Sequence, residues 1–272
     1  MTVPAGAPAL AGALRALAGR PRYWFFDIDG TLAEIRPTPD AVAVPRRRRQ
    51  LLEALHCPPT SWVTLASGRG IQDIDRLFPE ALPQGWSVIA GHGAVMRHRG
   101  HTERRIPPAI DAALAELAED LGRLLPRFPG SRLEVKDGAL ALHWRLLAPE
   151  AVEPLTRALD TALAHYPGLR RCPAKMAWEV RPVPGPDKGE AIVTLLGREA
   201  GAEWADRLAV IMMGDDATDE EAFLALGEGA LTVRVGPPSE PTFARFRLSH
   251  PAAVEAFLRR HLDEAVRSPR PV

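Results

Sequence analysis

Two carboxylates stand two residues apart at the point where a short aromatic run ends. The run 23–26 stops at Asp27, and Asp29 follows before the turn-forming Gly30 and Thr31. One carboxylate can attack a phosphoryl group while the other transfers a proton, and a metal ion can neutralise both. The alternative is a strand followed by an Asp-rich turn, but D-x-D-G-T after an apolar strand is already a fairly specific pattern.

Two further motifs suit a bound phosphate. Ser67-Gly68-Arg69 follows the apolar run 62–66, and a hydroxyl with backbone N–H groups at a strand end can bind a phosphate oxygen. Asp187-Lys188-Gly189 precedes a helical pattern, and its lysine can act as a point charge on phosphate. Each motif is weak alone, because Ser-Gly is common in turns and most lysines are solvated.

A fourth motif is acidic. The run Gly214-Asp215-Asp216-Ala217-Thr218-Asp219-Glu220-Glu221 follows the apolar stretch 208–213. Clustered carboxylates repel one another unless a cation is bound, and oxygen ligands without nearby His or Cys favour Mg²⁺ over zinc. An acidic helix N-terminus would explain Glu220 and Glu221 well, but it explains Asp215 and Asp216 poorly.

The elements that position these motifs alternate between strand and helix. We expect strands at 23–26, 62–66, 88–90 and 208–213, and helices at 46–55, 71–77, 189–200 and 220–226. This alternation predicts an α/β fold with a parallel sheet and right-handed crossovers, in which ligands bind beyond the carboxyl ends of the strands. Those ends carry Asp27, Ser67 and Asp215. The basic run 46–49 opens an amphipathic helix and is predicted to be solvated.

The middle of the chain has a different pattern. Helical spacing occurs over 110–124 and 152–163, and strands are expected at 132–136, 139–145 and 177–181, the first two joined by the hairpin turn Asp137-Gly138. This predicts a small α+β layer with an antiparallel sheet. Because core-type strands resume after it, we expect a core at 22–105 and 183–272 and an inserted domain at 106–182.

The predicted hairpin has one polar and one apolar face. Glu134 would pair with Ala141 and Arg132 with His143, and directly paired residues share a face. The polar face then carries Arg132, Glu134, Lys136, His143 and Arg145, joined by Glu179 and Arg181 from the third strand, while Leu133, Val135, Leu140, Leu142 and Trp144 pack on the helices. Mixed donors and acceptors suit a polyhydroxylated ligand such as a sugar, and an ordinary solvated face is equally consistent.

Composition narrows the partners. Lys+Arg and Asp+Glu are both 34, which gives no electrostatic reason to expect nucleic acid or an anionic membrane as partner. Cys57 and Cys172 cannot make a disulfide framework, so a cytoplasmic protein is expected. We find no apolar stretch of about 18 residues that could span a membrane. Residues 1–20 make a poor signal peptide and have no assignable role, whether as a helix or as a loose arm.

The order D-x-D-G-T, S-G-R, D-K-G, G-D-D-x-x-D resembles the haloacid dehalogenase superfamily of phosphatases, which have a Rossmann-like core. The resemblance implies that Asp27 is the nucleophile that becomes an aspartyl phosphate and that Asp29 is the general acid/base. It implies that Ser67 and Lys188 hold the phosphate. The implied Mg²⁺ ligands are Asp27, the Asp29 backbone carbonyl and Asp215, with Asp216 and Asp219 in support.

The inserted segment sharpens the resemblance. The stretches 134–136, 140–145 and 175–182 look like the cap-domain signatures of trehalose-6-phosphate phosphatases, and 91–94 and 214–223 look like their core signatures; the match runs from Trp24 to Leu258. The resemblance implies that the disaccharide is contacted, directly or through support, by Glu134, Lys136, His143, Arg145 and Glu179, with Arg69 and His92 near the cleft. His92 stands between two glycines and is about equally consistent with a simple loop hydrogen bond. Ile28 and Trp144 depart from the residues usual in the family.

The resemblance predicts hydrolysis of trehalose 6-phosphate to trehalose and phosphate in trehalose biosynthesis, with the cap closing over the sugar to exclude water. We expect a monomer, with a trehalose-phosphate synthase as the candidate partner. Two alternatives stay open: a phosphatase for another sugar phosphate, such as a sucrose- or glycerate-linked ester, and a non-catalytic sugar-phosphate sensor or regulatory half of a synthase complex. The intact set Asp27, Asp29, Lys188 and Asp215 argues against lost catalysis.

Overall fold

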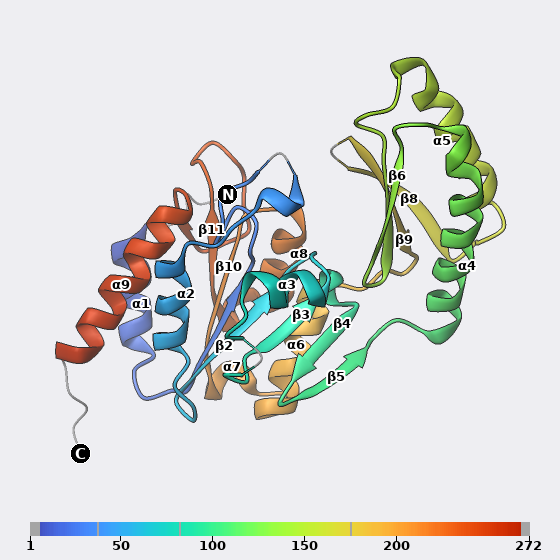
Figure 1. Cartoon of the computed structure of the whole chain (residues 1–272). Coiled ribbons are helices and arrows are strands. Elements are labelled where there is room, and N and C mark those ends of the chain that lie inside the picture. The colour runs from blue at the N-terminus through green and yellow to red at the C-terminus, as the bar shows by residue number, and fades with distance from the viewer. Residues whose placement is uncertain (1–5, 37, 82, 175, 268–272) are drawn as a thin grey trace. The chain divides into compact units, whose positions relative to one another are not determined.

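The chain folds into two compact units. The computed structural model describes residues 6–267 except 37, 82 and 175. Unit 1 comprises Met1–Glu103 and Asp187–Val272, and unit 2 comprises Arg104–Pro186. Each unit has its own sheet (Figure 1).

Unit 1 is built on a mainly parallel sheet. Its strands are β1 (Arg22–Phe26), β2 (Ser61–Ala66), β3 (Ser87–Ala90), β4 (Val95–His98), β5 (His101–Arg104), β10 (Ala209–Gly214), β11 (Ala230–Val235) and β12 (Phe246–Leu248), in the order β12-β11-β10-β1-β2-β3-β4-β5. Strands β12 to β3 in this order pair in parallel, and β4 pairs antiparallel to β3. The predicted parallel α/β core is confirmed, and the sequence pattern did not indicate β4, β5, β11 or β12.

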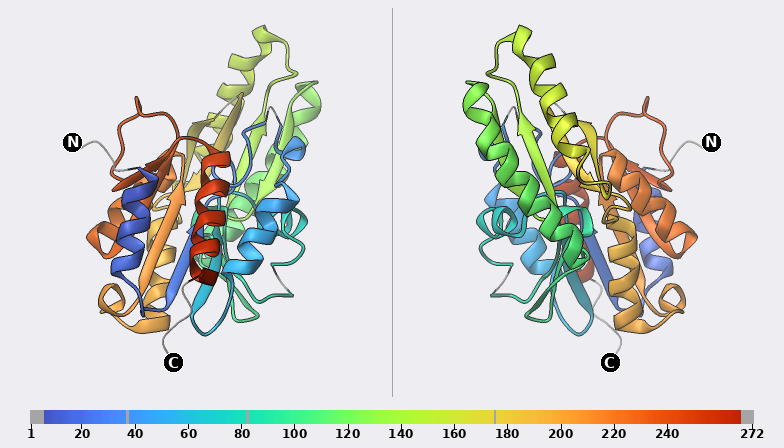
Figure 2. Two further views of the ribbon diagram at one scale, coloured as in Figure 1. Left: turned by 90° about the vertical axis from the view of Figure 1, so that its left-hand side faces the viewer. Right: turned by 90° about the vertical axis from the view of Figure 1, so that its right-hand side faces the viewer.

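Helices cover both faces of this sheet (Figure 2). Residues of α1 (Ala7–Ala16), α2 (Arg46–Leu55), α3 (Ile71–Leu77) and α9 (Pro251–Arg267) pack into one apolar cluster, and those of α6 (Lys188–Ala200), α7 (Trp204–Arg207) and α8 (Ala217–Leu226) pack into a second. Three short 3-10 turns, η1 (Pro39–Ala41), η2 (Gly91–Gly93) and η4 (Gly227–Gly229), connect the elements. None of the helices within the described ranges combines the length and the apolar character needed to cross a membrane.

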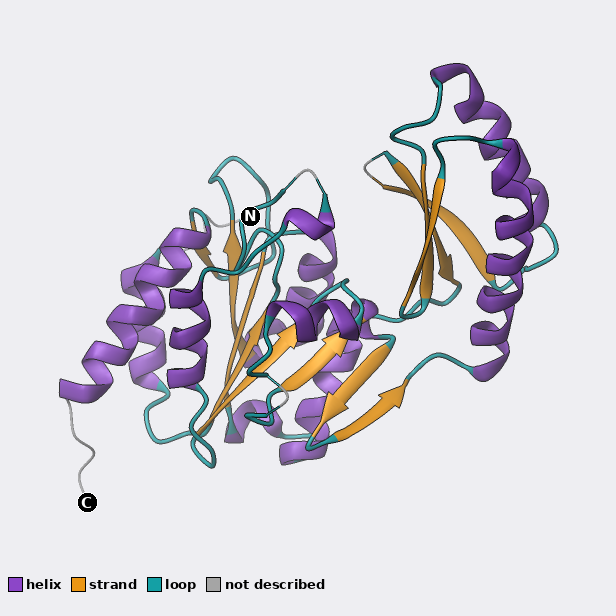
Figure 3. Cartoon of the chain, in the orientation of Figure 1, coloured by secondary structure: helices purple, strands orange, loops and turns teal. Residues whose placement is uncertain are grey.

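Unit 2 is an antiparallel sheet packed on two helices (Figure 3). The sheet order is β6-β7-β9-β8, with β6 (Arg132–Lys136), β7 (Ala139–His143), β8 (Leu169–Ala174) and β9 (Ala177–Pro182). The helices are α4 (Pro108–Leu124), followed by η3 (Leu125–Arg127), and α5 (Pro149–Leu163). The predicted inserted α+β layer with an antiparallel sheet is confirmed.

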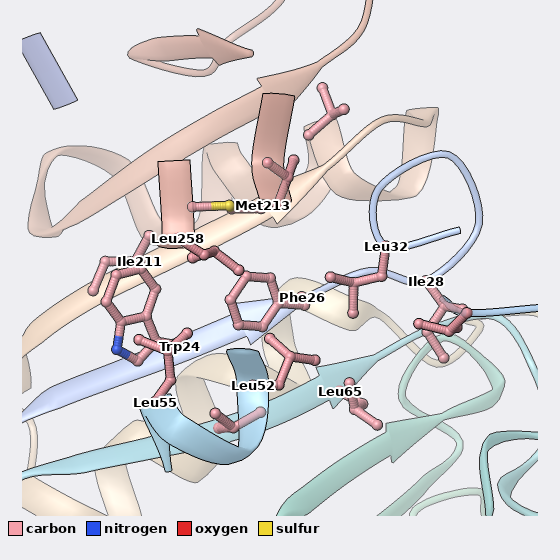
Figure 4. Packing of buried hydrophobic residues seen from close by; sticks show 14 of the residues in the cluster. Trp24, Phe26, Ile28, Leu32, Leu52, Leu55, Leu65, Ile211, Met213 and Leu258 are labelled. Carbon is pink, nitrogen blue, oxygen red and sulfur yellow. The ribbon is translucent and has the colours of Figure 1, made fainter. Parts of the chain in front are cut away.

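The central strand β1 shows why the sequence reads as continuously apolar before Asp27. Trp24 and Phe26 belong to the first cluster of unit 1, whereas Tyr23 and Phe25 belong to the second. Figure 4 shows Trp24 and Phe26 among aliphatic side chains from α2, β2, β10 and α9. Because both faces of a parallel sheet are buried, alternate residues are apolar on each face and no polar alternation is left.

The hairpin of unit 2 has the predicted register. Glu134 lies opposite Ala141 and Arg132 opposite His143, and Gly138 in the turn has φ 76°. The prediction that Val135 packs on the helices is wrong, because Val135 is 68% exposed on the edge strand β6. Of the β6 residues, only Leu133 packs against the apolar cluster of unit 2.

Two further sequence predictions need correction. Strand β7 ends at His143, so the strand predicted to 145 is too long and Arg145 lies beyond it, exposed to solvent. The basic run 46–49 is not uniformly solvated, because Arg48 is buried on the face of α2 that also buries Leu52 and Leu55. That spacing places Arg48 toward the core, whatever its charge.

Glu199, at the end of α6, joins elements that lie far apart in the sequence. Its carboxylate accepts hydrogen bonds from Tyr23 Oη at 2.6 Å and from Arg99 Nη2 at 2.8 Å, and His98 Nε2 lies 2.8 Å away. The side chain is 5% exposed. Burial alone would raise the pKa of Glu199, but the bonds to Tyr23 and His98 outweigh it and lower the pKa.

We predict that Glu199→Ala lowers the free energy of unfolding by about 3 kcal/mol at neutral pH, because it leaves buried partners unpaired. A carboxyl group with a lowered folded-state pKa stabilises above its unfolded pKa, and this contribution disappears as the pH falls through the folded value. Urea unfolding at decreasing pH measures both effects. Glu203, whose exposed side chain lies 3.7 Å from Arg207, supplies the control, since Glu203→Ala should change stability by less than about 0.5 kcal/mol. Equal losses in the two variants would contradict a special role for Glu199.

Candidate active site

The four sequence motifs meet at one edge of the unit 1 sheet. Asp27 follows β1, Ser67 follows β2 and Asp215 follows β10, and β1 lies between the other two strands. Phe26 pairs with both Leu65 and Met213, so the three parallel strands end within one residue of one another. This is the edge at which open α/β sheets bind ligands.

A buried lysine links the carboxylates at this edge. Lys188, the first residue of α6, donates from Nζ to Asp27 Oδ1 at 3.0 Å and to Asp219 Oδ1 at 2.7 Å. The three side chains are at most 5% exposed. Burial alone would lower the pKa of Lys188, but the two carboxylates outweigh it and raise the pKa. The ammonium therefore stays charged and is a fixed positive charge beside Asp27.

Three carboxylates form an oxygen-lined cluster next to the lysine. Asp27, Asp215 and Asp219 each offer one oxygen, and these oxygens lie within 4.8 Å of one another. Burial, reinforced by the charges of Asp219 and Asp216, raises the pKa of Asp215 to about 8. Burial and the same kind of repulsion also raise the pKa of Asp27, although Lys188 opposes this. A hard divalent cation would favour the ionised forms, so the donor set fits such an ion.

Asp219 and Asp216 have structural partners within the protein. Asp219 Oδ2 accepts the backbone N–H groups of Asp215 at 2.8 Å and Asp216 at 3.1 Å, so it fixes the loop that carries Asp215. Asp216 lies outside the oxygen cluster and is the N-cap of α8, where its Oδ1 accepts the N–H groups of Thr218 and Asp219. The motif therefore combines a candidate metal ligand with a helix cap.

Asp29 is held by a guanidinium group. Arg69 donates from Nε to Asp29 Oδ2 at 2.6 Å and from Nη2 to Asp29 Oδ1 at 2.8 Å, a bidentate pair. The Arg69 side chain is 8% exposed and that of Asp29 is 38% exposed, so the carboxylate is fixed but accessible. The side chain of Asp29 lies outside the oxygen cluster of Asp27, Asp215 and Asp219.

The turn after Asp29 contacts Asp215 closely. Gly30 has φ 82°, and a Cβ at this position would lie 2.0 Å from Asp215 Oδ2, so only glycine fits. Thr31, which is fully buried, donates from Oγ1 to Asp215 Oδ1 at 3.4 Å. The sequence motif contained Thr31, but its contact with Asp215 could not be foreseen because the two residues are far apart in the chain.

Ser67 and His92 lie together at the same edge. Ser67 is 2% exposed, and its Oγ accepts the N–H of Arg69 at 3.3 Å. The backbone N–H of His92 donates to Ser67 O at 3.1 Å, and a Cβ on Gly68 would lie 2.3 Å from the imidazole ring. His92 thus packs on the S-G-R turn, and its contact with a substrate stays a prediction.

Four of the residues predicted to bind a sugar lie on one face of the unit 2 sheet: Glu134, Lys136, His143 and Glu179. Arg145 lies beyond the end of β7. His143 Nε2 lies 2.7 Å from Glu134 Oε2, and Lys136 Nζ donates to Glu179 Oε1 at 2.9 Å. Arg181 Nε also donates to Glu179, at 2.7 Å. Burial would raise the pKa of Glu179, but Lys136 and Arg181 lower it to about 2. The cluster therefore presents charged donors and acceptors. Lys175, which belongs to the predicted cap signature 175–182, lies outside the described residues.

Comparisons with known proteins agree with this geometry. The family model for trehalose-phosphatases matches residues 25–251. A trehalose-6-phosphate phosphatase from Escherichia coli is 34% identical over 83% of this chain and 81% of its own length. A bifunctional trehalose-6-phosphate synthase/phosphatase from Thermoproteus tenax is 34% identical over 84% of this chain and 30% of its own length.

Solved structures give the same result. The C-terminal domain of a trehalose-6-phosphate phosphatase from C. albicans superposes with a TM-score of 0.76 at 25% identity, covering 96% of this chain and 98% of that domain. A trehalose-6-phosphate phosphatase related protein superposes with a TM-score of 0.72 at 27% identity, covering 90% of this chain and 99% of its own. The family match spans both units and every core motif described above, and the chain belongs to the trehalose-phosphatase family.

Proposed function

We propose that this chain hydrolyses trehalose 6-phosphate to trehalose and inorganic phosphate, as a step of trehalose biosynthesis. The observation that carries the proposal is the buried contact between Lys188 and Asp27, with Asp215 beside them. Family membership and the Escherichia coli relative support the substrate. A non-catalytic sensor would not need this complete set of charged groups, so we favour the enzyme.

The reaction proceeds in two steps. A carboxylate oxygen of Asp27 attacks phosphorus, the bond from phosphorus to the sugar oxygen breaks, and Asp29, which is protonated for this step, donates its proton to that oxygen and becomes a carboxylate. Asp29 then accepts a proton from a water molecule that attacks the aspartyl phosphate, which releases phosphate and regenerates Asp27. Lys188 and Ser67 bind the phosphoryl oxygens throughout, and Arg69 orients the Asp29 carboxylate.

A divalent ion, Mg²⁺ in our proposal, fits the oxygen cluster. Asp27, Asp215 and the backbone carbonyl of Asp29 would hold it, with Asp216 and Asp219 fixing the loop around it. When bound, the ion supplies positive charge that offsets the negative charge of the carboxylates and of the phosphoryl group.

Sugar recognition belongs to unit 2 in this proposal. Residues 22–105 with 183–272 form the catalytic core, and 106–182 form the cap. Within the cap, sugar hydroxyls would be bound by Glu134, Lys136, His143, Arg145 and Glu179, with Arg69 and His92 contributing from the core. Glu179 stays ionised over the physiological range and is therefore a permanent acceptor, whereas Lys136 is a donor.

The proposal extends to a partner and a cellular compartment. The Thermoproteus tenax relative is named a bifunctional synthase/phosphatase, which supports association of this chain with a trehalose-phosphate synthase. Cys57 and Cys172 are both free, which is consistent with the cytoplasm, a reducing compartment.

We predict that Asp27→Asn yields a folded protein whose turnover of trehalose 6-phosphate falls at least about 10³-fold, because an amide of the same shape cannot act as the nucleophile. Phosphate release measures turnover, and circular dichroism with thermal unfolding verifies the fold. Asp206→Asn, at an exposed position on α7, is the matched control and should keep full activity. Substantial turnover by folded Asp27→Asn would rule out this nucleophile.

We predict that Glu134→Ala and Lys136→Ala each reduce kcat/KM for trehalose 6-phosphate at least about tenfold, with little effect on p-nitrophenyl phosphate, because a hydrogen bond to a charged group is worth about 1.5–3 kcal/mol. Val135→Ala lies between them in the sequence, on the opposite face of the strand, and should leave both substrates unaffected. Equal losses on both substrates would show that these residues do not bind the sugar.

We predict that chelation with EDTA abolishes phosphate release and that added Mg²⁺ restores it. Asp215→Asn should raise the Mg²⁺ concentration needed for half-maximal rate at least about tenfold, because a neutral amide is a poorer ligand for a hard cation. Full activity in the presence of the chelator would contradict the metal site.

A further inference from the structure

Arg48 is a buried cation that contacts the turn 28–33, which contains Asp29, Gly30 and Thr31 of the D-x-D-G-T motif. It lies on α2 in line with Leu52 and Leu55, whose side chains pack in the core shown in Figure 4, and its own side chain is 7% exposed. Arg48 Nη1 donates to the carbonyl oxygen of Leu32 at 2.9 Å. Because removing a guanidinium from water is costly, its placement here calls for a specific role.

The turn that Arg48 contacts carries the proposed acid/base. Ile28 O accepts the N–H groups of Leu32 at 2.9 Å and Ala33 at 2.8 Å, and Gly30 N–H donates to Ala33 O at 2.8 Å. These bonds close the turn on itself around Asp29. Leu32 and Ala33 are fully buried, so the carbonyl of Leu32 needs a donor from the protein, and Arg48 supplies one.

The charge of Arg48 is balanced from two other segments. Its Nε donates to Glu255 Oε2 on α9 at 3.2 Å, and its Nη2 donates to Glu34 Oε1 at 3.4 Å, just beyond the turn. One planar guanidinium therefore connects the turn, α2 and α9, which a single ammonium could not do with the same geometry. The turn is anchored from the core as well as through the contact of Thr31 with Asp215.

We propose that Arg48 is a positioning residue for the phosphatase reaction. Through the Leu32 carbonyl it fixes the turn that places Asp29 and Thr31 beside Asp27 and Asp215. This inference rests on the proposed function. A displacement of about 1 Å at a reacting group can reduce a rate about 10²-fold, so loosening this anchor should lower kcat rather than substrate binding.

Arg48→Met and Arg47→Met form a matched pair. Arg47 contacts the same carboxylate, Glu255, at 3.3 Å, but from a position that is 59% exposed. At a temperature where both variants are folded, we expect Arg48→Met to lose about tenfold to a hundredfold in kcat on both trehalose 6-phosphate and p-nitrophenyl phosphate, with KM changed less than about threefold. Arg47→Met should stay within about twofold of the wild-type kcat.

Two more variants separate positioning from general stability. Glu255→Gln removes the charge that pairs with Arg48, so it should lower the unfolding temperature. Because it leaves the bond from Arg48 to Leu32 in place, kcat should stay within about threefold of the wild-type value. Arg48→Lys keeps the charge but not the fork, and it should retain part of the activity, with kcat still at least about threefold below wild type. Arg48→Lys carries the test if Arg48→Met does not fold.

A readout independent of turnover completes the test. Amide hydrogen exchange in a peptide covering 27–34 should accelerate in Arg48→Met or Arg48→Lys and not in Arg47→Met. Wild-type kcat in a folded Arg48 variant, unchanged exchange in this peptide, or an equal kcat loss in Glu255→Gln would each overturn the proposal. If the wild-type protein hydrolyses neither substrate, the proposed function fails, and the exchange measurement alone decides whether Arg48 anchors the turn.

Discussion

One buried ammonium group organises the site of this protein. Lys188 lies between Asp27 and Asp219 and donates a hydrogen bond to each. Lys188 and Asp27 are 161 positions apart in the sequence. The contact between Lys188 and Asp27 joins the part of unit 1 that precedes unit 2 to the part that follows it. Asp27 and Lys188 are both nearly inaccessible to water, so neither could be buried without the other at tolerable cost. The site and the core of unit 1 must therefore form together.

The same constraint explains the chemistry at the sheet edge. Lys188 offsets only part of the negative charge. The pKa of Asp215 stays raised because the carboxyl group is buried and because Asp219 and Asp216 lie close to it. An edge with excess carboxylate beside a fixed ammonium suits a divalent cation together with a phosphoryl group. Two arginines fix the groups around this edge. Arg69 binds the carboxylate of Asp29, and Arg48 binds the carbonyl of Leu32 in the turn that carries Asp29.

What the sequence could predict was local. The hairpin register follows from the turn Asp137-Gly138, and the parallel core follows from apolar runs that end in polar residues. The rest depends on contacts between distant segments. In the sequence, Arg48 is one of four consecutive arginines, and only the packing of α9 against α2 distinguishes it from the others. Val135 fits the apolar pattern of its strand, but it is exposed because this strand lies at the edge of the sheet. The substrate was predicted from the family resemblance. Residue spacing and charge alone could not decide whether the polar face of the hairpin binds a sugar or is an ordinary solvated surface.

Whether Asp27 accepts the phosphoryl group is tested most directly by a crystal structure grown with Mg²⁺ and beryllofluoride, which mimics an acyl phosphate. Our account predicts beryllium bonded to a carboxylate oxygen of Asp27, with fluorine atoms contacting Lys188 and Ser67 and the metal ion contacting Asp27 and Asp215. Beryllofluoride bonded to a different side chain, or bound well away from Lys188, would contradict it.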